Sequence, residues 1–70
     1  MDIAIHTDTI QLDQFLKLAG AVASGGEVKA LLVESMILRN DVPETARRRK
    51  LVPGDVITIN GSDAYRVVRV

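Results

Sequence analysis

The spacing of apolar residues changes along this chain, and this change constrains the fold more than any other feature. One stripe of an amphipathic helix, at positions i, i+3, i+4 and i+7, is formed by Leu12, Phe15, Leu16 and Ala19. After Met36 the apolar residues stand instead in short segments separated by turn residues. The pattern therefore predicts helices in the first half and a small sheet in the second.

A break at Gly20 and a second start signal divide the helical half in two. The residues Ser24-Gly25-Gly26-Glu27 read as a break followed by a capping box, in which the Ser24 hydroxyl accepts from the Glu27 amide and the Glu27 carboxylate reaches back. The second helix is expected to bury a stripe complementary to that of the first, made of Val28, Leu31 and Leu32.

Strand signals occur at both ends of the chain. Ile3 and Ile5 alternate with more polar neighbours and predict a short edge strand. Asn40-Asp41 follows a strand-like segment and predicts a hairpin turn, after which Pro43 confines the chain to an edge or a loop. Asn60-Gly61 predicts a second hairpin, with strands at Val56–Ile59 and Tyr65–Val70.

These elements predict a single α+β domain over residues 1–70, with two packed helices followed by a small antiparallel sheet. A chain of 70 residues buries only about 60% of its unfolded surface, so its core is small. The expected core consists of Phe15, Leu16, Leu31, Leu32, Ile37, Leu51, Val56 and Ile57.

Several functional classes lack the residues that they need. The chain has no cysteine and a single histidine, His6, which has few partners for a metal site or for acid-base catalysis. We therefore expect no enzyme, no cofactor, no metal and no small-molecule substrate. The N-terminus has neither a signal peptide nor a membrane span, and the absence of cysteine suits a reducing cytoplasm, where we expect the protein.

Four consecutive cations, Arg47-Arg48-Arg49-Lys50, stand in a protein whose formal net charge is zero. Such a block is either a solvated loop or a surface that meets an anion such as a phosphate backbone. Five of the nine Lys and Arg residues fall between Arg39 and Lys50, and Lys17 and Lys29 are expected to lie near one solvent edge of the helix pair. Because Phe15 and Tyr65 are the only aromatic residues, base stacking on an aromatic platform is not expected.

Taken together in order and spacing, these motifs resemble the alpha-L RNA-binding domain named after ribosomal small-subunit protein four, in its small stand-alone bacterial form. The matching positions are Phe15-Leu16-Lys17, Ser24-Gly25-Gly26, Lys29, Asn40, Glu44-Thr45, Arg47, Arg49-Lys50-Leu51 and Pro53-Gly54-Asp55. Ser35 and Asp41 stand where that family has glycine, and Arg48 adds a cation.

The resemblance implies a non-catalytic protein that binds structured RNA, of the ribosomal or transfer RNA class, through its helices and first hairpin loop. Combined with the cation pattern, it makes the candidate RNA-binding residues Lys17, Lys29, Arg39, Asn40, Arg47, Arg48, Arg49 and Lys50.

A second hypothesis keeps the fold but makes the chain a protein-interaction adaptor, which binds a partner along an exposed strand edge at Tyr65–Val70. The identity of the RNA and the oligomeric state stay open at this stage.

Overall fold

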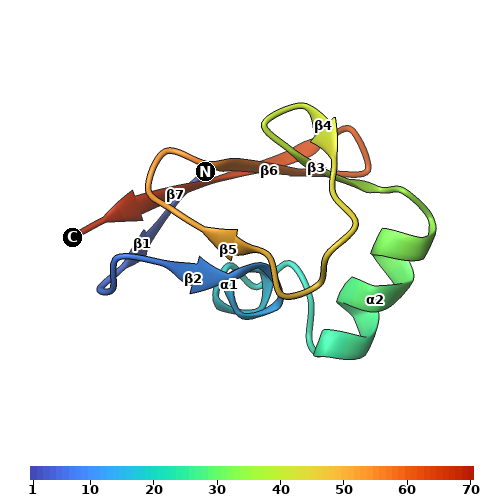
Figure 1. Ribbon diagram of the computed structural model, residues 1–70, viewed down its shortest axis with the longest axis horizontal. Helices are drawn as coiled ribbons and strands as arrows, with labels where there is room; N and C mark the ends of the chain where they lie inside the picture. The colour runs from blue at the N-terminus through green and yellow to red at the C-terminus, as the bar shows by residue number, and fades with distance from the viewer.

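The computed structural model describes residues 1–70 and contains two helices and seven strands (Figure 1). The helices are α1 (Leu12–Leu18) and α2 (Gly25–Val33). The main sheet is formed by β1 (Asp2–Ile5), β3 (Ile37–Arg39), β4 (Val42–Pro43), β6 (Val56–Ile59) and β7 (Asp63–Arg69). A small antiparallel pair is formed by β2 (Ile10–Gln11) and β5 (Lys50–Leu51). The predicted α+β fold is confirmed.

The strands of the main sheet lie in the order β1-β7-β6-β3-β4. Its central pairs are antiparallel, as expected, and β1 is added in parallel to β7 with Ile3 opposite Val67. Strand β7 is therefore paired on both sides, and the expectation of an exposed edge at Tyr65–Val70 is wrong. The parallel partner, β1, comes from the opposite end of the chain. No turn or loop connects it directly to β7, so local sequence patterns do not predict this pairing. The edges of the sheet are β1 and β4.

Both predicted hairpins are confirmed by their backbone angles. Asn40 and Asp41 have φ values of 53° and 69° between β3 and β4, and Asn60 and Gly61 have 54° and 71° between β6 and β7. Positive φ at both central residues is the hairpin geometry that matches strand twist, and Asn, Asp and Gly tolerate it best. Ser35 also has a positive φ, 56°, at a position where the resembled family has glycine.

The helix boundaries follow the predicted breaks, but the capping box does not form. Helix α1 ends before Gly20, whose φ is 75°, and α2 begins directly after Ser24. The Ser24 side chain makes no cap hydrogen bond. Ser24 and Glu27 are both exposed, so water can satisfy the free amides of this helix start without help from either side chain.

Ten buried apolar residues form one core between the main sheet and the helices, which lie to one side of it (Figure 1). The predicted core positions Phe15, Leu16, Ile37, Leu51 and Ile57 are all buried. The expectation for Leu31, Leu32 and Val56 is wrong in degree, because these three are only half-buried. Helix α2 buries Val28 fully in the core, and the half-buried Leu31 and Leu32 pack against it.

Candidate nucleic-acid interface

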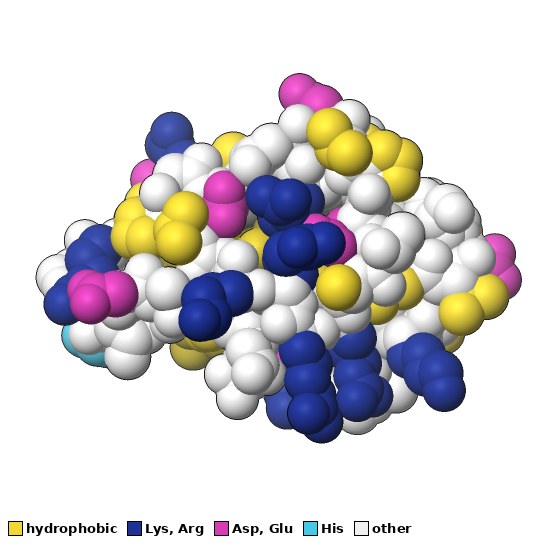
Figure 2. Space-filling view, in the orientation of Figure 1, with side chains coloured by type: hydrophobic (Ala, Val, Ile, Leu, Met, Phe, Trp, Pro, Cys, Tyr) yellow, Lys and Arg dark blue, Asp and Glu magenta, His cyan; other side chains and the backbone are white.

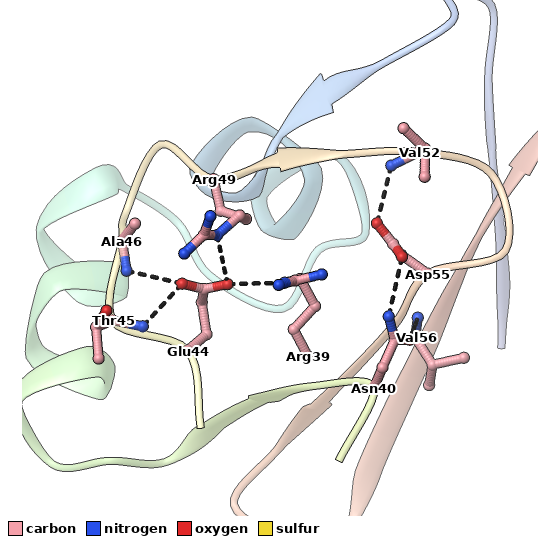
Figure 3. A network of polar contacts seen from close by, with 9 residues as sticks. All are labelled: Arg39, Asn40, Glu44, Thr45, Ala46, Arg49, Val52, Asp55 and Val56. Atoms are coloured by element: carbon pink, nitrogen blue, oxygen red, sulfur yellow. Dashed lines mark hydrogen bonds and ion pairs between the residues drawn. The ribbon is translucent and has the colours of Figure 1, made fainter. Parts of the chain in front are cut away.

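A buried carboxylate, Glu44, organises the segment that follows β4 (Figure 3). Its Oε1 accepts hydrogen bonds from Arg39 Nε at 2.9 Å and from Arg49 Nε at 2.8 Å. Its Oε2 accepts from the backbone amides of Thr45 at 2.8 Å and Ala46 at 2.9 Å. Glu44 is only 4% exposed, so these four donors replace the water that a free carboxylate would bind.

The same contacts fix the charge of this group. Burial by itself raises the pKa of Glu44, but the hydrogen bonds from Arg49, Ala46, Arg39 and Thr45 outweigh it and lower the pKa from 4.5 to about 2. The carboxylate in turn raises the pKa of Arg49. Glu44 is therefore an anion at any physiological pH, and it holds two arginines and the start of the loop together.

The loop of residues 45–49 is also bound to the start of α1 by its backbone. The Leu12 amide donates to the Arg49 carbonyl at 2.8 Å, and the Asp13 amide donates to the Arg47 carbonyl at 3.1 Å. The first amides of a helix have no partner within the helix, and no side chain caps α1, so the loop supplies the acceptors. This basic loop is thus held against the body of the protein although Arg48 and Arg49 are exposed.

A second polar network connects the first hairpin to the strand beside it (Figure 3). Asn40 Nδ2 donates to Asp55 Oδ1 at 3.0 Å, and the Val56 amide donates to Asn40 Oδ1 at 2.9 Å. The other oxygen of Asp55 accepts from the Val52 amide at 2.9 Å. The Asn40 side chain therefore has a donor and an acceptor contact within the protein, and both hold the β3–β4 turn in place.

The nine cations of the chain fall into two groups. Four arginines form ion pairs: Arg39 and Arg49 with Glu44, Arg66 with Asp2, and Arg69 with Asp8. The other five form none, and they are Lys17, Lys29, Arg47, Arg48 and Lys50. The four paired arginines share three carboxylates, because Arg39 and Arg49 both contact Glu44. The remaining cations are free to meet an external anion.

Four of the unpaired cations, Lys17, Lys29, Arg47 and Arg48, belong to α1, α2 and the loop attached to α1, and we call them the basic face. Figure 2 shows several dark blue side chains gathered along the lower edge of the molecule. Lys29 and Arg47 line the same surface hollow, of about 420 Å³, together with Leu32, Val33 and Thr45. A protein without net charge therefore presents a strongly positive edge.

The eight predicted site residues fall into two kinds: some have side chains that are hydrogen-bonded within the protein, and others form no ion pair within it. The structure brings Lys29 and Arg47 together at the hollow, and Lys50 lies on β5 with an exposed side chain. Arg39, Arg49 and Asn40 have partners within the protein. Their contact with RNA stays a prediction.

Sequence reasoning gave no role to Glu44, which is the centre of the arrangement. The available signal was an acid with an arginine five residues away on either side.

No group of three or more His, Cys, Asp or Glu side chains could hold a metal ion, and His6 is exposed after β1. Neither helix has the length and apolar character needed to cross a membrane.

A family model described as the S4 domain matches residues 3–68, a range that extends from β1 to β7. The chain is also 48% identical over 66 residues to the "Probable ribosome maturation protein RlbA" of Bacillus subtilis (strain 168), an alignment that covers 94% of this chain and 93% of that protein. The chain belongs to the S4 domain family, a family of RNA-binding domains.

Proposed function

We propose that this protein binds structured ribosomal RNA through the basic face and takes part in ribosome maturation as a non-catalytic cytoplasmic factor. The observation that carries the proposal is the division of the cations into two groups. The other four arginines form ion pairs with acids of the chain, whereas Lys17, Lys29, Arg47 and Arg48 form none. Unpaired cations gathered at one edge are suited to a run of phosphates.

The construction of the loop supports this role. A flexible loop loses conformational freedom when it binds a ligand, and this loss lowers the affinity. The Glu44 contacts and the two backbone bonds to α1 fix the main chain on both sides of Arg47 and Arg48 before any RNA arrives. Arginine adds a planar fork of donors that fits phosphate oxygens. The loop therefore presents Arg47 and Arg48 from a fixed main chain.

The choice of ribosomal RNA rests on family membership and on the relative whose printed name is a ribosome maturation protein. The surface supports a structured target as well. Double-stranded RNA hides its base edges in a narrow major groove, so proteins recognise it by phosphate contacts and shape. A cluster of cations without an aromatic platform matches that mode of recognition. We propose no reaction and no cofactor for this chain.

The dependence of RNA affinity on salt tests the proposal. If the basic face contacts about four phosphates, a plot of log affinity against log salt should fall with a slope of about −3 to −4. The double variant Arg47→Ala/Arg48→Ala should make the slope less steep by about 2 and weaken binding to fully paired RNAs of different sequence alike, because phosphate contacts carry no base identity. Fluorescence anisotropy with a labelled ribosomal RNA fragment measures both quantities.

The matched control is Arg66→Ala/Arg69→Ala, which removes the same charge from arginines that pair with Asp2 and Asp8. This control should keep the slope of the unmodified protein. Equal slopes for both double variants, with folding intact, would show that the basic face is not the RNA contact.

A further inference from the structure

The surface hollow between α2 and the basic loop is lined by apolar as well as basic side chains, and phosphate binding alone does not require the apolar ones. Helix α2 contributes Lys29, Leu32 and Val33, which recur at i, i+3 and i+4 and so share one side of the helix. The loop contributes Thr45 and Arg47. The volume of about 420 Å³ lies within the range of small-ligand sites.

Its apolar wall is only partly covered by the chain, although Leu32 also packs against the core. Val33 is 77% exposed at the end of α2, and Leu32 is only half-buried. Beside this wall stand Lys29 and Arg47, neither of which forms an ion pair, and the exposed Thr45, whose hydroxyl can donate or accept. A ligand that contacts both kinds of side chain needs an apolar face for Leu32 and Val33. It also needs an anionic group, only a few bonds away, for Lys29 and Arg47.

We propose that the hollow takes one unpaired nucleotide of the bound RNA, an inference that rests on the proposed function. The base lies against Leu32 and Val33 and stacks on the Arg47 guanidinium plane, while its phosphate meets Lys29. A nucleotide inside a duplex cannot enter, because its base is stacked between its neighbours. An unpaired nucleotide at a bulge or loop can be turned outward, as is usual where proteins recognise single positions in RNA.

Continuity with the basic face selects RNA over an acidic peptide as the occupant. Arg47 belongs both to the hollow and to the basic face, so phosphates that bind along the face lead directly to this site. The absence of an aromatic residue from the hollow makes the stacking contribution small. We therefore expect it to lie near the lower end of the fivefold to hundredfold range that base stacking on proteins provides.

The test compares two RNA hairpins of about 20 nucleotides that differ only by one bulged adenosine, with binding followed by fluorescence anisotropy. The unmodified protein should bind the bulged hairpin about fivefold more tightly than the fully paired one. Val33→Ser, which removes the apolar contact without changing charge, should reduce this preference to less than about twofold and leave the salt slope unchanged. Val70→Ser is the control, because Val70 is similarly exposed, at 63%, and lies outside the hollow.

Four results would contradict the nucleotide site. Equal affinity for the two hairpins with a steep salt slope would overturn the nucleotide site and leave the proposed function intact. A preference for the bulge that Val33→Ser and Val70→Ser retain equally would also overturn it. A flat salt slope with both hairpins would reject phosphate binding by the basic face, and the absence of binding to either hairpin would reject RNA binding itself; either result would reject the nucleotide site as well.

Discussion

Replacement of Leu16 by alanine is expected to lower the free energy of unfolding by about 2 to 5 kcal/mol. Leu16 has no exposed surface and belongs to the single core of the domain, so truncation removes buried apolar area and leaves a cavity. A domain of this length has a total stability of roughly 4 to 10 kcal/mol, which makes this loss a large fraction of the whole. Urea unfolding followed by circular dichroism should show a much lower midpoint.

The same helix provides the control. Leu18 lies two residues further along α1 and is 56% exposed, so Leu18→Ala makes the same chemical change without opening a cavity. We expect its effect to stay within about 0.5 kcal/mol. Equal losses for Leu16→Ala and Leu18→Ala would contradict the assignment of the buried stripe.

Replacement of Glu44 by glutamine should cost about 2 to 4 kcal/mol at neutral pH. The change keeps the shape of the side chain but removes the charge that Arg39 and Arg49 share, and it places an amide group among groups that are all donors. The two arginines are partly exposed and can regain water, which keeps the loss below that of a fully buried pair. Urea unfolding at neutral pH measures the cost.

The pH dependence of stability gives a second readout for Glu44. Its pKa is about 2 in the folded protein and 4.5 without the folded contacts, so this carboxylate stabilises the fold above pH 4.5 and loses its contribution as the pH falls towards 2. The shift corresponds to about 3 kcal/mol. Glu44→Gln should lack this part of the acid-induced loss, whereas Glu34→Gln, at an exposed position, should retain it. An identical acid profile for the unmodified protein and Glu44→Gln would contradict the role of Glu44.

Local patterns in the sequence predicted the elements of this fold well. The stripe that contains Leu12 and Phe15 identified α1, and Asn40-Asp41 and Asn60-Gly61 identified both hairpins, because each pattern reports a backbone preference of adjacent residues. The order and spacing of the motifs from Phe15 to Asp55 identified the S4 domain family. The basic run pointed to the loop that the structure holds against α1.

Features that depend on distant residues were not accessible in this way. The pairing of β1 with β7 joins segments from opposite ends of the chain, and burial of Val67 follows from that pairing. Which cations are free also depends on tertiary contacts, because Arg48 and Arg49 are adjacent and exposed yet only Arg49 reaches Glu44. Sequence reasoning therefore found the charged region but could not separate its structural arginines from its unpaired ones.

The central claim is that RNA binds at the basic face, and amide chemical shift mapping by NMR tests it most directly in a protein of 7.6 kDa. Addition of a ribosomal RNA fragment to the isotope-labelled protein should shift the amides around Lys17, Lys29 and the loop of residues 45–48 most strongly. The amides of β1 and β7, where Arg66 and Arg69 are paired with acids, should change little. Shifts concentrated on β1 and β7 with the basic face unaffected would contradict the account.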